Sequence, residues 1–550
     1  MNQHLLSLVC GLPLAAGLIL LFTPRQMVGF IRSFTVISML VTFGLSLRLL
    51  SGDYTGYAFQ FAERHVLVPA YGISYSVGVD GISLWLILLT TFITPLATYA
   101  SWTHIETKVK EYAVSLLLLE CAMLGAFVAL DLFLFYVFWE LMLIPMVLII
   151  GIWGGVRRVY AAVKFFLFTM VGSVLMLVAM LYLVAQFKAQ TGHYTFELSE
   201  LKMLLLPAHV QLWLFCAFAL AFAIKVPMFP LHTWLPDAHV QAPTGGSVIL
   251  AAVLLKLGTY GFLRFAMPLF PSGSHRASST LVLLAVIGIL YGAYCAWAQS
   301  DVKKLVAYSS VSHLGFVMLG ICSLSSHGLT GSILQMVNHG ISTGALFLLV
   351  GVIYERRHTR ELSAFGGLAK VMPDYATVFV IVTMSSIGLP TTNGFVGEFM
   401  ILAGAFMSEM LGKYGPIAAS VSALGVILAA VYMLHAVLKM FWGPLDNPDN
   451  KDLPDLTPRE RWALAPLVVL IFYIGLFPSR MLTDMKPAVD RFANEYMSKL
   501  YAGNQNPSTR DMLREDYVPI GAVDIRGRRA ELASVEGRTQ QLARAEGVAP

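Results

Sequence analysis

Stretches of about 20 apolar residues recur along almost the whole chain, separated by short polar segments. A bilayer core of about 30 Å is crossed by a helix of roughly 20 residues, so each stretch predicts one transmembrane helix. The pattern therefore predicts an all-α polytopic membrane protein with about fourteen transmembrane helices. The expected spans are residues 5–22, 28–50, 82–102, 112–130, 131–151, 164–186, 208–226, 246–266, 278–298, 303–322, 328–354, 372–389, 416–441 and 463–479.

Two of these runs, the seventh and the twelfth, continue into broken extensions that contain proline, at residues 225–235 and 388–402. Proline removes a backbone donor and clashes with the preceding turn, so both helices should be interrupted. The two interruptions lie about 163 residues apart. The same offset roughly superposes the block 112–266 on the block 278–441. Matching breaks in two halves indicate an internal repeat and its transport site. The alternative is that prolines are simply frequent in transmembrane helices.

This pattern predicts five parts along the chain. The two repeats form the centre, and a polar segment rich in arginine follows the last helix. The expected boundaries are 1–111 for helices 1–3, 112–266 for helices 4–8, 278–441 for helices 9–13, 442–499 for helix 14 with its flanks, and 500–550 for the polar tail.

The composition supports lipid as the main solvent. Hydrophobic residues make up 57% of the chain, charged residues 13%, and the mean hydropathy is +0.72, whereas soluble domains are about 25% charged. The net charge of +5 is spread over short loops, so no continuous basic face for nucleic acid is expected. The five cysteines form no CxxC pair, and no metal-ligand spacing or nucleotide-binding motif stands out. The first apolar run has no basic residues before it and is interpreted as a retained helix.

The basic residues of the loops predict the orientation. Loops after odd-numbered helices carry seventeen lysines and arginines, and loops after even-numbered helices carry seven. Positive loops remain in the cytoplasm, so both termini are expected on the opposite, periplasmic side. The arginines of the polar tail point the other way, but long tails count little in this rule.

Six ionisable residues lie where a charge is costly, at about 3 kcal/mol each near the bilayer centre. Such residues must be paired, hydrated or neutral. A lysine beside a glutamate keeps its proton and releases it once the glutamate is neutralised, and histidine relays protons near neutral pH. Two alternatives stay open: a structural ion pair between the first glutamate and the first lysine, and histidines that only pack. The candidates for proton translocation are Glu140, Lys225, Lys256, His313, His339 and Glu398.

Other charged residues in or near the spans are weaker candidates. Glu120 lies inside an apolar run, closer to its centre than to its end. Residues at span boundaries are expected to be solvated or interfacial, and two aspartates at helix edges are expected to cap helices. The boundary residues are Asp131, Lys303, Lys304 and Lys439, and the expected caps are Asp80 and Asp237.

The charged segments also carry a specific resemblance. Residues 138–145 (FWELMLIP), 225–239 (KVPMFPLHTWLPDAH) and 301–313 (DVKKLVAYSSVSH) resemble the antiporter-like subunits of respiratory complex I, NADH:quinone oxidoreductase. Residues 238–243 followed by 254–258 (LLKLG) are similar to the subunit M group, called chain 4 in mitochondria. In that group a glutamate stands at position 398, where the sister subunits L and N and sodium/proton antiporters usually carry lysine.

This resemblance implies two inverted five-helix repeats, helices 4–8 and 9–13, with helices 7 and 12 broken. It implies that Glu140 and Lys225 form a coupling pair, Lys256 connects the two halves, and Glu398 is the exit residue beyond a histidine relay. No redox cofactor is expected on this chain: FMN, iron–sulfur clusters, NADH and quinone belong to other subunits. The expected partners are the L and N types of membrane-arm subunit, in the lipid bilayer of a bacterial inner membrane. The relay residues are His313 and His339.

Three other functions remain open from the sequence. The chain could serve a multisubunit sodium/proton antiporter, although Glu398 counts against this, or a membrane-bound hydrogenase with the same fold. It could also be a scaffold that only braces a membrane complex. Thr391 and Thr392 stand where the family often has a glycine-containing turn, and residues beyond about 500 resemble no family segment.

Overall fold

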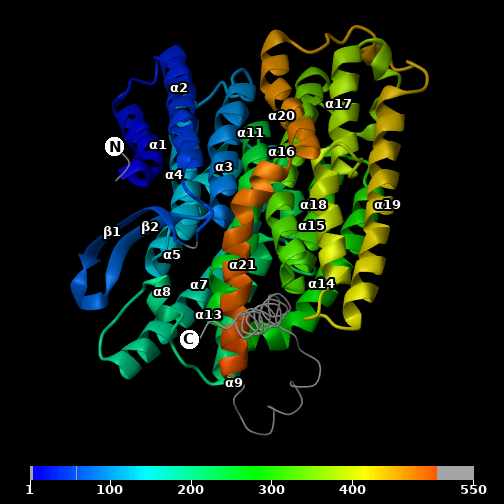
Figure 1. Ribbon diagram of the computed structural model, residues 1–550. Helices are drawn as coiled ribbons and strands as arrows, with labels where there is room; N and C mark the ends of the chain where they lie inside the picture. Colours follow the sequence, from blue (N-terminus) through cyan, green and yellow to red (C-terminus); the bar gives the residue numbers. More distant parts are fainter. Residues whose placement is uncertain (1–3, 57, 504–550) are drawn as a thin grey trace, which may run out of the picture. The chain divides into compact units, whose positions relative to one another are not determined.

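The computed structural model describes residues 4–56 and 58–503, and nearly all of their apolar stretches are helical (Figure 1). In this part, twelve helices are long and apolar enough to cross a membrane, and the bent pair α20 (Pro458–Leu476) and α21 (Ser479–Gly503) would make thirteen. The prediction of an all-helical, membrane-spanning fold is confirmed. The number falls below fourteen because the twelfth expected span is divided into two short helices, α17 (Pro373–Ser386) and α18 (Asn393–Phe406).

The N-terminal part adds a β-hairpin, which the apolar pattern did not predict, to three helices (Figure 1). Across the antiparallel strands Glu63 lies opposite Val77 and His65 opposite Tyr75. Gly72 ends the turn at φ 65, a left-handed conformation that glycine adopts without strain. The hairpin was missed because its strands, of 9 and 7 residues, are far shorter than the apolar runs that predicted the helices. The elements are α1 (Leu5–Phe22), α2 (Val28–Ser46), η2 (Leu47–Ser51), β1 (Gln60–Val68), η3 (Pro69–Tyr71), β2 (Ile73–Val79) and α3 (Gly81–Ala100).

The next block contains the first interrupted helix. α9 ends at Lys225 and α10 begins at Trp234, so the interruption falls where the prolines predict it. The indole N–H of Trp234 donates to the carbonyl of Ile224 at 2.9 Å, which satisfies a backbone group freed by the break. The elements are α4 (Val109–Val128), α5 (Leu132–Leu141), α6 (Leu143–Trp153), α7 (Arg158–Thr191), α8 (Leu198–Leu201), α9 (Ala208–Lys225), α10 (Trp234–Gln241), α11 (Thr244–Ile249), η4 (Leu250–Leu254), α12 (Leu255–Gly261), η5 (Phe262–Ala266) and α13 (Met267–Leu269).

The following block contains the second interruption, between Ser386 and Asn393. Its turn places Gly388 at φ 75 and Thr391 at φ 81. A β-branched threonine rarely adopts positive φ, so the turn is strained where the family often has a glycine-containing turn. The positions of both breaks were predicted, whereas the inverted relation of the two blocks and the boundaries at 111, 266, 278 and 441 stay predictions. The remaining elements of this block are α14 (Pro271–Trp297), α15 (Val302–Ser323), α16 (Ser326–Arg357), η6 (Leu362–Ala364), η7 (Leu368–Lys370) and α19 (Tyr414–Phe441).

The chain continues through η8 (Pro448–Asn450) and α20 into α21, a helix that no apolar run predicts. Residues 1–497 form one unit, and a second unit begins at Ser498. Within the first unit, α21 bonds to distant elements: Asp490 accepts from Ser326 at 2.9 Å, and the hydroxyls of Tyr496 and Ser274 lie 2.8 Å apart. Most of the expected polar tail, residues 504–550, lies outside the described residues.

Several charged residues near the span ends depart from expectation. Asp80 caps α3 as predicted, but Asp237 lies inside α10 and pairs with Lys164 at 2.7 Å instead of capping a helix. Asp131 and Lys303 were expected to be solvated and are buried. Asp131 accepts backbone N–H groups at the start of α5, and Lys303 donates to a backbone carbonyl, so each finds a polar partner inside the protein.

Candidate functional site

The most deeply buried spans carry the candidate residues. The apolar centres of the span Thr244–Leu269 and of helix α16 are completely buried, and that of α15 almost completely. These three carry Lys256, His339 and His313 respectively. A helix surrounded by protein on all sides has no route for a charged side chain to reach the membrane surface. Ionisable groups here must therefore be neutralised or hydrogen-bonded inside the protein.

Lys256 occupies the centre of this core. It lies on α12, between the π-helical segments η4 and η5, and its side chain is fully buried. π-helical turns widen a helix and occur frequently at functional sites. The Lys256 ammonium donates to the carbonyl of Ala251 and lies 2.7 Å from Nδ1 of His339. No ion pair of Lys256 occurs among the described residues, so a proton on it can pass directly to an imidazole.

Two histidines connect Lys256 to an acid. The rings of His339 and His313 meet edge to face with their centroids 5.7 Å apart. Nδ1 of His313 lies 2.9 Å from Oε1 of Glu398 on α18. The contacts thus run from a lysine through two imidazoles to a carboxylate, all buried. The structure brings together four of the six candidate residues.

Glu398 occupies a polar pocket beside the second break. Its Oε1 accepts a hydrogen bond from the amide of Gln335 at 3.0 Å. Its Oε2 faces Gly388, where an added Cβ would lie 3.1 Å from that oxygen. Because Gly388 has no side chain, the break leaves room for the carboxylate of Glu398 at this position.

Further polar groups stabilise the same break. Asn338 donates to the carbonyl of Asn393 at 2.7 Å, at the start of α18. The hydroxyl of Ser385 donates to the side-chain oxygen of Asn393, and Ser342 bonds to Ser385 at 2.6 Å. Such groups replace the helical hydrogen bonds that an interruption removes. They also give Glu398 a polar environment, which lowers the cost of burying its charge.

Lys225 and Glu140 are less directly joined than the resemblance implies. Lys225 is buried at the end of α9, and its ammonium lies over the rings of Trp139 and Phe165, at 5.1 and 5.6 Å from their centroids. Glu140 lies close enough for its charge to act on Lys225. No ion pair joins the two within residues 4–56 and 58–503, and Oε1 of Glu140 has no hydrogen-bond partner there. Aromatic faces stabilise the cation in place of the carboxylate.

The first break also contacts the helix that carries Lys256. A Cβ added to Gly258 would lie 2.9 Å from the backbone nitrogen of Val226. Gly258 is two residues after Lys256, and Val226 directly follows Lys225. The backbones of the two elements therefore touch, and a movement of the break would act on the Lys256 helix directly.

One further residue was not singled out from the sequence. His239 on α10 is fully buried, and its ring stacks on Phe347 at 4.5 Å between centroids and 8° between planes. Neither ring nitrogen has a partner among the described residues. His239 lies within electrostatic range of Lys256, His339 and Lys303. The sequence held only a weak signal, because His239 follows the first break in a short segment that no apolar run marks.

A cavity of about 400 Å³ lies beyond Lys303. His104, Arg157 and Arg360 also line it, and all four residues belong to segments that the loop charges predict to be cytoplasmic. Burial, together with the charges of Lys303 and His358, lowers the pKa of His104, so its imidazole is neutral at pH 7 and can accept a proton. Lys303 donates to the carbonyl of Ala242 at 2.6 Å, and Val240, the residue after His239, also lines the cavity. The cavity thus reaches the vicinity of His239.

Glu120, the weaker candidate, is fully buried on α4. Oε1 accepts a hydrogen bond from the hydroxyl of Thr94 at 2.7 Å, and Oε2 has no partner in the described part of the chain. Among the described residues, no hydrogen bond or ion pair joins Glu120 to the Lys256–Glu398 series, so it does not belong to that series.

Comparisons with known proteins agree with this architecture. A family model for NADH:quinone oxidoreductase/Mrp antiporter transmembrane segments matches residues 129–437, and one for the amino terminus of NADH-ubiquinone oxidoreductase chain 4 matches residues 12–129. NADH-quinone oxidoreductase subunit M from Rhodobacter capsulatus is 46% identical over 510 residues, which cover 90% of this chain and 98% of that protein. The chain belongs to the subunit M family. A plant member of the family, chain 4 from Arabidopsis thaliana, is 41% identical over 479 residues, covering 87% of this chain and 94% of its own length.

Solved structures show the same fold. A chain of respiratory complex I from Thermus thermophilus with bound NADH matches with a TM-score of 0.80 and 36% identity. The match covers 89% of the chain described here and 99% of the Thermus chain. A chain of the Mrp complex from Dietzia sp. DQ12-45-1b matches with a TM-score of 0.76 but 22% identity, over 91% of this chain and 98% of that one. The second match shows a shared fold alone. The family assignment therefore rests on the subunit M relatives.

Proposed function

We propose that this chain is the proton-translocating subunit M of a membrane-arm assembly in NADH-quinone oxidoreductase. The observation that carries the proposal is the series of contacts from Lys256 through His339 and His313 to Glu398. Each member binds or releases a proton, and each lies in contact with the next. A scaffold would have no need for four costly ionisable groups in one continuous row.

In this path Lys256 receives a proton and passes it to Nδ1 of His339. His339 and His313 hand it on by ring reorientation, and His313 delivers it from Nδ1 to Oε1 of Glu398. Moving one charge against 100 mV requires about 2.3 kcal/mol, and this energy comes from electron transfer in other subunits. The chain itself performs only proton binding and release.

Glu140 and Lys225 have the role of a switch next to this path. The aromatic contacts of Lys225 stabilise its cation without a carboxylate, so Glu140 can move toward it or away from it. Each movement changes the electrostatic potential at the first break, whose backbone touches the Lys256 helix. A proton on Lys256 is therefore retained or released according to the state of this pair.

The switch role predicts a loss of coupling in either Glu140→Ala or Lys225→Ala. Both variants should assemble with the other subunits, since neither residue makes an ion pair within the described part of the chain. NADH-driven proton pumping should fall several-fold, because Lys256 no longer experiences a changing charge. Quenching of a pH-sensitive dye in inverted membrane vesicles measures this effect. Normal pumping by either assembled variant would refute the switch role.

His239 is proposed to connect the cytoplasmic cavity with Lys256. The replacement His239→Phe keeps a ring that can stack on Phe347 and removes only the titratable nitrogens. Pumping should slow, while assembly and NADH oxidation with an uncoupler present stay normal. The matched control is Phe347→Leu, which removes the stacking partner and keeps the imidazole. If His239→Phe pumps like the wild type, the protons reach Lys256 by another route.

The proposed assembly is tested by a tag on this chain. NADH-oxidising subunits that carry flavin and iron–sulfur clusters should co-purify with it, together with antiporter-like subunits of the L and N types. We place the chain in a bacterial inner membrane with both termini periplasmic, as the loop charges favour. A cysteine-labelling experiment from each side of the membrane, at engineered loop cysteines, checks this orientation.

A sodium/proton antiporter subunit is the alternative within the same fold, because the family model that matches residues 129–437 also covers Mrp antiporters. Sodium-driven pH change in vesicles without NADH would support that alternative. The glutamate at position 398 argues against it, because lysine is usual there in the antiporters that the sequence resembles. Co-purification with a hydrogenase instead of NADH-oxidising subunits would indicate that the chain is a subunit of a membrane-bound hydrogenase.

A further inference from the structure

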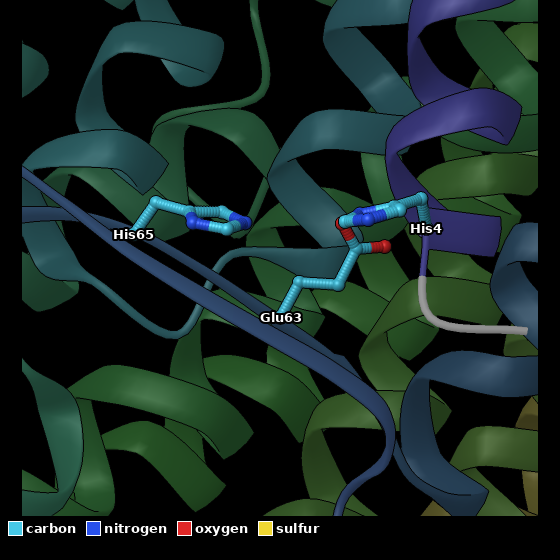
Figure 2. A group of neighbouring side chains, drawn as sticks. All are labelled: His4, Glu63 and His65. Carbon is cyan, nitrogen blue, oxygen red and sulfur yellow. The ribbon is translucent and has the colours of Figure 1, made fainter.

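Three potential metal ligands gather where the start of α1 meets the β-hairpin. His4 precedes α1, whereas Glu63 and His65 belong to β1 (Figure 2). Alternate residues of a strand share one face, so both β1 residues lie on the same side of the hairpin. Figure 2 shows the two imidazole rings directed toward each other, with the Glu63 carboxylate pointing into the space beside them. One ligand atom from each residue lies within 4.8 Å of the other two.

The carboxylate of Glu63 is held in a fixed position. Glu63 is buried, and its Oε1 accepts the backbone N–H groups of Leu6 and Ser7, both at 3.1 Å. Its Oε2 accepts the hydroxyl of Ser7 and lies 3.4 Å from Nδ1 of His4. Hydrogen bonds of this kind orient a carboxylate ligand around a metal. Oε2 keeps lone-pair capacity on the side that faces the imidazoles.

The two histidines are accessible and adjustable. The side chain of His4 is 66% exposed, and His65 is also exposed. Their ring centroids lie 6.3 Å apart with 23° between the planes. Metal–ligand bonds of about 2.0–2.2 Å in tetrahedral geometry place ligand atoms about 3.4 Å apart. Rotation of two exposed rings can close the remaining distance, and an ion can enter directly from solvent.

We propose that His4, Glu63 and His65 bind one divalent transition-metal ion of the zinc class. Two imidazoles and one carboxylate suit Zn²⁺, whereas Mg²⁺ and Ca²⁺ require oxygen ligands. Three protein ligands leave a fourth position for water. The bound ion joins the start of the first helix to the hairpin. This inference does not depend on the proton path, since none of the three residues belongs to it.

Zinc uptake by the purified full-length chain in detergent tests the site. After treatment with a chelator and dialysis against Zn²⁺, elemental analysis should find one more zinc per chain in the wild type than in the double variant His4→Ala/His65→Ala. The matched control is His209→Ala, which removes an exposed histidine at the start of α9. It should bind as much zinc as the wild type. Equal uptake by the wild type and the double variant would overturn the proposal.

A second variant tests the site without removing the hydrogen bonds that cap α1. Glu63→Gln keeps an amide oxygen that accepts from the N–H groups of Leu6 and Ser7, so the start of α1 stays capped. It removes the anionic ligand, and Zn²⁺ affinity should fall at least tenfold. Thermal unfolding with and without Zn²⁺ should show a rise in Tm for the wild type and a smaller rise for this variant. The same Zn²⁺ affinity and Tm rise in both proteins would show that Glu63 only caps the helix.

Discussion

Replacing Lys256 with methionine should reduce NADH-driven proton pumping by roughly tenfold or more, while the complex still assembles. Methionine has a similar length and fills the space between η4 and η5, but it cannot hold a proton. Removing the buried ammonium also removes a desolvation cost, so the chain should be as stable as the wild type or more so. Without Lys256, His339 has no proton donor on the path that leads to Glu398.

The measurement is dye quenching in inverted vesicles, with NADH oxidation recorded in the same sample. Lys439→Met provides the control, because Lys439 is an exposed lysine on α19 at the end of a span. It should pump normally. If Lys256→Met assembles and pumps at the control rate, protons do not pass through this lysine, and the row of contacts has only a structural role.

The ionisable groups of the proposed path were visible in the sequence, but the contacts between them were not. A lysine or glutamate in the middle of an apolar run is conspicuous, and this identified Lys256 and Glu398. The sequence could not show that His313 touches Glu398, because they are 85 positions apart and meet only through the packing of α15 against α18. The lysine–histidine contact between α12 and α16 depends on tertiary packing in the same way.

The missed features share a physical cause. Apolar runs of about 20 residues reveal elements that face lipid or a large core. The hairpin strands are too short to form such a run, and α21, although 25 residues long, is too polar. His239 was overlooked because it lies in a short helix after a break. The described residues show no ion pair between Glu140 and Lys225, the alternative that the sequence left open, and aromatic rings lie around the ammonium instead.

The two helix interruptions contain different kinds of side chains, and this difference fits their proposed roles. The first places a lysine among aromatic rings, where its charge is held without fixed hydrogen bonds. The second places a glutamate in hydrogen-bond contact with the amide of Gln335 and the imidazole of His313. A loosely held cation suits a switch, whereas a firmly hydrogen-bonded acid suits the end of a path. The interruptions thus place the proposed switch and exit on opposite sides of Lys256 along the chain.

A different buried pair has a structural role and gives the second prediction with a large effect. Arg264 on η5 makes two hydrogen bonds with Asp80, at 2.8 Å and 2.5 Å, and both side chains are buried. Arg491 on α21 also contacts Asp80, at 3.2 Å. Arg264 is one of the seven basic residues that the sequence analysis assigned to loops after even-numbered helices, but the structure places it inside a buried helical segment. Asp80 caps α3 as well, so a single carboxylate joins α3, η5 and α21.

Asp80→Asn should therefore destabilise the chain by about 3–5 kcal/mol, the usual cost of leaving a buried charge without its partner. Asparagine can still cap α3, so the loss comes from the uncompensated arginine. Little of the variant should accumulate in membranes, as measured by immunoblot and by recovery of assembled complex. Asp374→Asn is the control: its pair with Arg461 at 2.7 Å is more than half exposed, and such pairs contribute about 1 kcal/mol or less. The double change Asp80→Leu/Arg264→Met should recover part of the loss, because an apolar pair removes the buried charge that the single variant leaves behind. Normal accumulation of Asp80→Asn would show that water or another group compensates Arg264, and that this carboxylate does not hold the three elements together.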